Sequence, residues 1–123
     1  MNDSHTREIL TRSLDILQNV RQRPEMYLRQ VTPEGVEAWL AGFQVGLFSA
    51  GVRSSAYGLR DACERRGIPF TTTVDLIGAL AGQGHSPHEV AMILIDMEEE
   101  MWRSSLADVS GDFGGHEPRP NAG

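Results

Sequence analysis

The sequence contains no lysine, so arginine supplies all eleven of its basic side chains. It contains a single cysteine, Cys63, which excludes an internal disulfide and fits a reducing cytoplasm. Its most apolar run, residues 36–52, includes Glu37 and is short for a membrane-spanning helix of roughly 20 residues. The first residues are polar and lack the apolar core of a secretory signal. We therefore expect a cytoplasmic protein with no membrane segment.

The sequence also lacks the motifs that would indicate an enzyme. It has no phosphate-binding glycine loop, no dinucleotide-binding glycine fingerprint after a strand, and no serine in a nucleophile elbow. Cys63 is predicted to be a small buried helix residue, because no histidine stands in a catalytic pattern with it. His85 and His88 lack the further ligands of a metal site. The sequence therefore predicts a non-enzymatic protein with neither a cofactor nor a metal.

Charge is distributed unevenly along the chain. Residues 1–66 contain nine arginines and eight acids, whereas residues 67–123 contain two arginines and nine acids. The formal net charge at pH 7 is −6. Because phosphate groups repel a negatively charged chain, this balance disfavours non-specific binding to nucleic acids and to anionic membranes.

Apolar residues recur at helical spacing in several segments. We expect helices over residues 4–20, 33–50, 54–66, 74–81 and 87–104. The second and fifth have strong start signals, in which Thr32 or Ser86 acts as N-cap and a proline follows at the first helical position. Candidate caps for the two shorter helices are Ser54 or Ser55 and Thr72 or Thr73.

These segments predict an all-α fold. We expect a compact bundle of about five helices over residues 1–107, with the second and fifth helices at its centre. Residues 108–123 are rich in glycine, proline and aspartate, and they predict a flexible, disordered tail.

The expected second helix has two different faces. One is a stripe of bulky residues for the core, formed by Val36, Leu40, Phe43 and Leu47. The other is a row of small residues at four-residue spacing, formed by Ala38, Gly42, Gly46 and Ala50. A row of this kind lets another helix approach closely. We expect the fifth helix to be that neighbour, and a homodimer through the Gly42 and Gly46 face is the alternative.

A charged connector, residues 21–31, separates the first two helices and contains three consecutive apolar residues, Met26, Tyr27 and Leu28. These side chains either pack against the core or stay exposed for a partner. Packing of Tyr27 and Leu28 onto the first two helices is the simpler interpretation. The connector also has a local basic character, which comes from Arg21, Arg23 and Arg29.

The second half of the fifth helix contains Glu98, Glu99 and Glu100. Three consecutive residues point in three directions around a helix, which indicates a solvated acidic face before it indicates an acid–base pair. Together with Asp96, such a face would attract a basic partner and speed association with it. A solvated helix end without a partner is the alternative interpretation.

The segment Val20–Leu28, VRQRPEMYL, resembles a motif found in two places. One is the N-terminal segment of gyrase B-type ATPases, which usually has glycine in place of Glu25 and whose nucleotide-binding motifs are absent here. The other is a group of small bacterial proteins with a first helix, an "RPxMYLG" motif and an aromatic-rich second helix, in which Arg29 here replaces the glycine. The resemblance covers about residues 10–50. It implies a small bacterial helical protein of the immunity or accessory type, without enzymatic activity.

The sequence therefore favours a protein that acts by binding another protein and that has an immunity-like or accessory role. The expected partner-binding residues are Arg21, Arg23, Met26, Tyr27, Glu98, Glu99 and Glu100. The alternative is a regulatory nucleic-acid-binding protein that uses Arg21, Arg23, Arg29, Arg53, Arg60, Arg65 and Arg66. Residues 76–94 have the outline of a helix-turn-helix. Their second helix is apolar and then acidic, however, whereas a reading helix is polar and basic.

Overall fold

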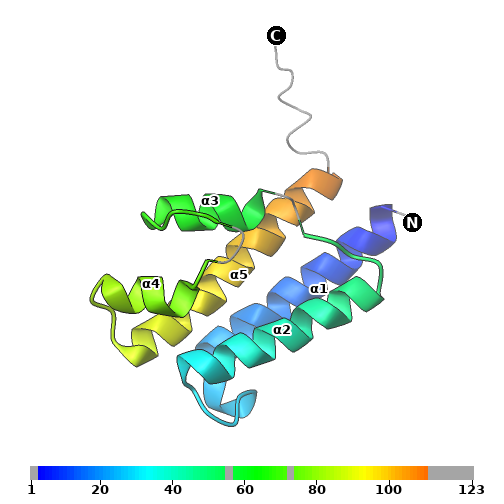
Figure 1. The fold of residues 1–123 in the computed structure, drawn as a ribbon. Coiled ribbons are helices and arrows are strands. Elements are labelled where there is room, and N and C mark those ends of the chain that lie inside the picture. The colour runs from blue at the N-terminus through cyan, green and yellow to red at the C-terminus, as the bar shows by residue number, and fades with distance from the viewer. Residues whose placement is uncertain (1–2, 55–56, 72–73, 111–123) are drawn as a thin grey trace.

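The computed structural model describes residues 3–54, 57–71 and 74–110, and it confirms the predicted all-α fold. Its helices are α1 (Asp3–Gln22), α2 (Pro33–Ser49), α3 (Gly58–Arg65), α4 (Leu76–Gly82) and α5 (Pro87–Ser110), with a short 3-10 turn (Pro24–Met26) after α1 (Figure 1). No strand is found in these described ranges. Within them, no helix combines the length and the apolar character needed to cross a membrane.

The longest helix, α5, forms the centre of the bundle, because it packs against each of the other helices. In Figure 1, α1 and α2 lie on one side of α5, and α3 and α4 lie on the other side. Among the described residues, the extensive packing of α2 is confined to α5. α2 is therefore an outer helix, and the expectation that it shares the centre of the bundle with α5 is wrong.

The predicted starts of α2 and α5 are confirmed by their hydrogen bonds. The Thr32 hydroxyl accepts from the Gly35 amide at 3.0 Å, with Pro33 at the first helical position. At the start of α5, the Ser86 hydroxyl accepts from the Glu89 amide at 3.2 Å, and the Glu89 carboxylate accepts from the Ser86 amide at 2.8 Å. This reciprocal pair is a capping box, which satisfies two amides that the helix itself cannot satisfy.

The shorter helices begin later than predicted. α4 begins after Asp75, whose carboxylate accepts from the Gly78 amide at 3.0 Å and acts as the N-cap. α3 begins after Tyr57, whose side chain forms no capping hydrogen bond. The predicted caps Ser55, Thr72 and Thr73 lie outside the described residues. α5 continues to residue 110, beyond its predicted end and beyond the predicted start of the tail at residue 108, and the rest of that tail is likewise outside the described residues.

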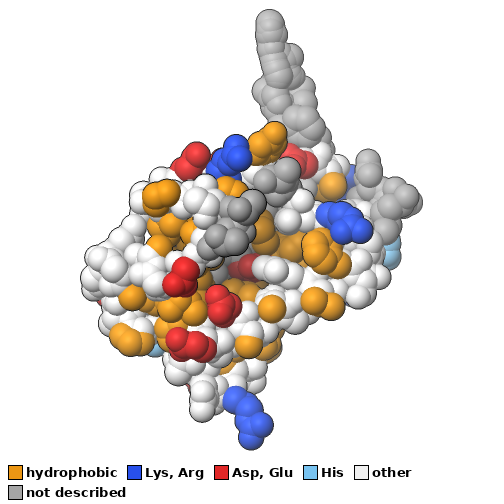
Figure 2. Space-filling view, viewed as in Figure 1, with side chains coloured by type: hydrophobic (Ala, Val, Ile, Leu, Met, Phe, Trp, Pro, Cys, Tyr) orange, Lys and Arg blue, Asp and Glu red, His pale blue; other side chains and the backbone are white. Residues whose placement is uncertain are grey.

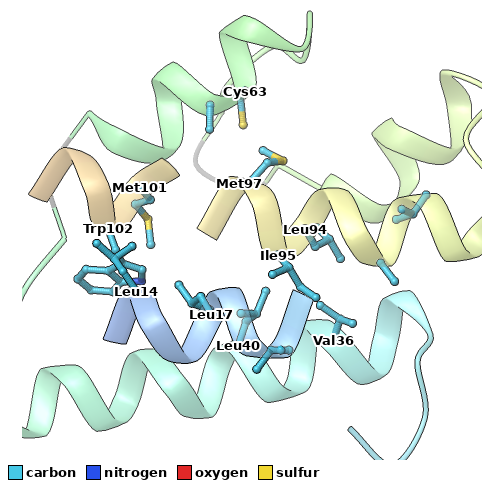
Figure 3. Packing of buried hydrophobic residues seen from close by; sticks show 14 of the residues in the cluster. Leu14, Leu17, Val36, Leu40, Cys63, Leu94, Ile95, Met97, Met101 and Trp102 are labelled. Carbon is cyan, nitrogen blue, oxygen red and sulfur yellow. The ribbon is translucent and has the colours of Figure 1, made fainter. Parts of the chain in front are cut away.

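The hydrophobic core lies where the inner faces of α1, α2, α3 and α4 meet α5. Its buried apolar members include Leu10 and Leu80. Figure 3 labels further members: Leu14, Leu17, Val36, Leu40, Cys63, Leu94, Ile95, Met97, Met101 and Trp102. The α1 members recur every three or four residues, as one face of a helix requires. Cys63 is buried within this cluster, as the sequence predicts, and burial raises the pKa of its thiol.

The two faces of α2 separate as predicted, but the small-residue row has no helix beside it. Val36, Leu40 and Leu47 are buried, whereas Gly42 and Gly46 are exposed. A Cβ atom added at either glycine would meet no atom within 4 Å. The expectation that α5 packs against this row is therefore wrong, because α5 packs against the bulky stripe. The homodimer through Gly42 and Gly46 stays a prediction.

Close approach to α5 occurs instead at Gly58, the first residue of α3. A Cβ atom added there would lie 3.0 Å from Met101 Cγ and 3.3 Å from the Met101 carbonyl oxygen. The missing side chain lets the start of α3 lie directly against the α5 backbone. α3 is thus positioned by one buried glycine rather than by a row of small residues.

Candidate functional site

The three consecutive glutamates of α5 do not form the predicted solvated acidic face. Because α5 is surrounded by other helices, each of its three directions meets a neighbour. Glu98 faces Gln44 of α2, Glu99 accepts from Gln18 of α1 at 3.4 Å, and Glu100 faces α3. Glu98 is only 7% exposed, so it is not available as a surface contact for a basic partner.

Glu99 and Glu100 are both paired with arginines of the same chain. Arg103 Nε donates to the Glu99 carboxylate at 3.0 Å. Arg65 and Arg66 donate to Glu100 at 2.8 Å and 2.9 Å, and the Arg66 guanidinium lowers the pKa of this carboxyl most strongly. The negative charge of Glu99 and Glu100, which was expected to attract a basic partner, is therefore largely neutralised by arginines of the same chain.

Arg21, which was also predicted to contact a partner, is likewise paired with an acid of the same chain. Its guanidinium forms an ion pair with Asp96 of α5, in which Nη2 and Oδ2 are 3.3 Å apart. The pair ties the end of α1 to the middle of α5, and the carboxylate raises the pKa of Arg21. Since both side chains are partly exposed, we expect this pair to contribute about 1 kcal/mol or less to stability.

The predicted connector divides into an anchored and an exposed part. Leu28 is buried, and its amide donates to the Pro24 carbonyl at 2.9 Å, which holds the turn against the bundle. Met26 and Tyr27 are 67% and 42% exposed. The structure thus confirms packing for Leu28 and leaves the other two apolar side chains at the surface. Arg23 is exposed beside them.

Two hollows flank this turn, and Tyr27 borders both. The larger, about 550 Å³, lies between the connector and the first turns of α2 and includes Trp39. The smaller, about 300 Å³, lies against the end of α1 and includes Arg23 and Met26. We call the exposed group Arg23, Met26 and Tyr27 the turn surface. Of the predicted partner-binding residues, the structure brings these three together and places Arg21, Glu98, Glu99 and Glu100 elsewhere.

A groove on another face was not predicted from the sequence. It lies between α2 on one side and α3 and α4 on the other, with α5 as its floor, and we call it the α5 groove. It contains two adjoining hollows of about 290 Å³ and 190 Å³ that share Gln44 and Leu59. Figure 2 shows hydrophobic side chains gathered over this face, with acidic side chains among them.

The floor of the α5 groove contains the buried carboxylate of Glu98. Gln44 Nε2 donates to its two oxygens at 2.9 Å and 3.0 Å, and Trp102 Nε1 donates at 2.7 Å. Among the residues the structure describes, no basic side chain forms an ion pair with Glu98. Burial raises the pKa of Glu98, and the hydrogen bonds from Gln44 and then Trp102 offset that effect only in part.

The raised pKa of Glu98 predicts a specific pH dependence of stability. In the unfolded chain this carboxyl loses its proton at a lower pH than in the fold, so the folded state binds more protons between the two pKa values. The contribution of Glu98 to stability is therefore fully present below the ordinary glutamate pKa and is lost as pH rises through the folded pKa. Because Glu98→Gln cannot ionise, we expect the free energy of unfolding of this variant to gain on wild type as pH rises.

Denaturant unfolding of both proteins from about pH 4 to about pH 8 spans the ordinary glutamate pKa and the range above it. A difference between Glu98→Gln and wild type that stays constant across this range would contradict the assignment.

The arginines of the nucleic-acid alternative do not form one free basic surface. Arg65 and Arg66 are paired with Glu100. The Arg53 guanidinium lies over the Phe48 ring, 5.0 Å from its centroid, and that of Arg60 lies near the Tyr57 and Phe70 rings. The exposed first turn of α5, residues 87–89, contains the acid Glu89, and residues 90–98 are buried or half-buried in the bundle. The helix therefore does not present the polar, basic reading face of a helix-turn-helix.

No metal-binding cluster is found within residues 3–54, 57–71 and 74–110. The His85 imidazole lies 3.8 Å from the Glu89 carboxylate, next to the capping box of α5. This histidine is therefore part of the helix start in the described structure.

Comparison with known proteins adds no family to these observations. No protein-family model matches the chain, no curated protein matches it, and no solved structure matches it.

Proposed function

We propose that the chain acts by binding another protein, in an immunity-like or accessory role, and that the partner contacts the turn surface. The observation that supports this proposal is the exposure of Met26 and Tyr27 in a turn whose backbone is anchored by Leu28. A fixed turn presents apolar side chains with little loss of conformational freedom on binding. Methionine and tyrosine are both enriched in protein interfaces.

The charges exposed at the turn surface favour an acidic partner rather than a basic one. The acids of α5 that favoured a basic partner are buried or paired with Arg21, Arg65, Arg66 and Arg103. Arg23 is exposed next to Met26 and has no ion pair among the described residues. An acidic group on the partner would complement it, so we propose a partner patch that combines apolar side chains with an acid.

Site-specific crosslinking tests this proposal in the cells that make the protein. A photoreactive phenylalanine replaces Tyr27 in one variant and Val45 in a control, because Val45 is 61% exposed and lies on α2 away from the turn surface. We expect a crosslink to a defined partner protein from position 27 and no crosslink to that protein from position 45, where the predicted homodimer would give a crosslink between two copies of the chain. Identical products from both positions, or no product from position 27 in a folded chain, would contradict the proposal.

The same partner gives a quantitative test. We expect Met26→Ser combined with Tyr27→Ser to weaken binding by about tenfold or more, because buried interface anchors contribute on the order of 1–2 kcal/mol each. The control Val45→Ser removes an exposed apolar side chain of similar character and should leave the affinity unchanged. Both affinities are measured by titration calorimetry with the purified partner.

A further inference from the structure

The α5 groove contains a polar group that the packing of the bundle does not require there. Glu98 lies at its floor among apolar walls that include Leu40, Leu76 and Met97. A leucine or methionine at this position would continue the buried stripe of α5. A charged carboxylate in apolar surroundings lowers stability unless an opposite charge or several donors compensate for it.

The donors around Glu98 compensate for its charge only in part. Gln44 and Trp102 supply neutral N–H groups, and neither brings a positive charge. A carboxylate has about four lone-pair positions for hydrogen bonds, so its oxygens can accept from a further donor. The residue borders the 190 Å³ hollow, from which such a donor would approach.

The adjoining hollow has the chemistry of a site for an apolar body. Phe48, Phe70, Met101 and Trp102 line its 290 Å³ together with Gln44, a residue that borders both hollows. Small-ligand sites are typically apolar concavities of about 300–1,000 Å³ with a few converging polar groups. A buried acid with a perturbed pKa in such a concavity marks a candidate binding site.

From this geometry we infer that the α5 groove binds a small organic cation. Its ammonium or guanidinium group donates to the Glu98 carboxylate, and its apolar body fills the hollow between Phe48 and Phe70. Charge complementarity selects the cation, because a neutral or anionic ligand leaves the buried carboxylate uncompensated. The Arg53 and Arg60 guanidiniums lie 5.0 Å and 5.8 Å from the centroids of the Phe48 and Phe70 rings, so they favour the apolar body of the ligand beside these rings and its cationic group at Glu98 in the other hollow.

This site is separate from the turn surface, so each proposal can fail without the other. The groove residues come from α2, α3, α4, α5 and the segments between them, and none of the turn-surface residues lines either groove hollow. A crosslink at position 27 reports on the turn surface alone.

Methionine methyl groups provide the readout in the wild-type chain. Met97 and Met101 line the two hollows, whereas Met26 is exposed in the turn. The probes are phenethylamine and phenethyl alcohol, which share an apolar body and differ in charge. In NMR spectra of isotope-labelled methionine methyls, we expect the amine to shift the Met97 and Met101 signals saturably and to leave Met26 unchanged. We expect the alcohol to bind at least about tenfold more weakly, as the loss of a charge-assisted hydrogen bond implies.

Glu98→Gln is the matched variant, because it keeps the shape of the side chain and removes its charge. We expect this variant to bind the amine and the alcohol with about equal affinity. Equal binding of both probes by wild type, no shift at Met97 and Met101, or a preference that survives Glu98→Gln would overturn the inference. The comparison of the two probes in wild type decides the question even if the variant fails to fold.

Discussion

Replacing Trp102 with alanine is expected to lower the free energy of unfolding by about 3–5 kcal/mol, the usual range for removing a buried tryptophan. Trp102 is among the largest fully buried side chains, and it lies in the core beside Met101 and Leu14 (Figure 3). Its removal opens a cavity next to α5 and deprives Glu98 of its 2.7 Å hydrogen bond. Chemical denaturation monitored by circular dichroism measures the loss.

Trp102→Phe separates these two contributions. Phenylalanine retains most of the apolar contact but cannot donate to Glu98, which keeps only the two hydrogen bonds from Gln44. The expected loss is about 1–3 kcal/mol, the cost of one lost hydrogen bond to a buried carboxylate together with a small cavity. If Trp102→Ala and Trp102→Phe both proved as stable as wild type, the described packing of Trp102 would be wrong.

A second large loss of stability is expected from a substitution in the contact between α1 and α5. Leu17→Ala is expected to lower the free energy of unfolding by about 2–5 kcal/mol, because Leu17 is fully buried and the neighbouring structure cannot fill the cavity completely. Since folded domains of this size are stable by only about 5–15 kcal/mol, this single change removes a large fraction of the total.

The adjacent residue Ile16 is the matched control for Leu17→Ala. Ile16 is 42% exposed, so Ile16→Ala should change stability by roughly 0.5 kcal/mol or less. The same denaturant titration serves both variants. Similar losses for the two neighbours would mean that α1 does not present Leu17 to α5.

The parts of the fold that local chemistry determines could be predicted from the sequence. The N-caps at Thr32 and Ser86 involve residues within three positions of one another, so their hydroxyl and proline signals place two helix starts correctly. The spacing of Leu10, Leu14 and Leu17 likewise identifies the buried face of α1. The start of α4 was missed because Asp75, not a threonine, is its cap.

The parts that depend on tertiary contacts could not be predicted in this way. The row at Gly42 and Gly46 has the spacing of a helix contact, but no local signal states which face of α2 meets α5. The close approach occurs at Gly58, a single glycine without a repeating pattern. The arginines that neutralise Glu99 and Glu100 include residues more than thirty positions away, so their pairing follows from the packing of α3 on α5.

The sequence contains one signal for the α5 groove. Glu98 stands four residues after Leu94 and three before Met101, so helical periodicity places it on the buried stripe of α5. Interpreting Glu98 to Glu100 as one acidic group concealed this position. A carboxylate on an apolar stripe indicates either a buried hydrogen-bonded acid or a binding site, and only the placement of Gln44 and Trp102 shows its partners.

Glu98 is an enclosed carboxylate that has no cationic partner among the described residues. The most direct measurement is the pH titration of its side-chain carboxyl carbon by NMR, compared with the same residue in an unfolded peptide of this sequence. We expect Glu98 to titrate at a higher pH in the folded protein than in the peptide, because burial outweighs the hydrogen bonds that it accepts from Gln44 and Trp102. Titration at the same pH as in the peptide, or at a lower pH, would contradict this expectation.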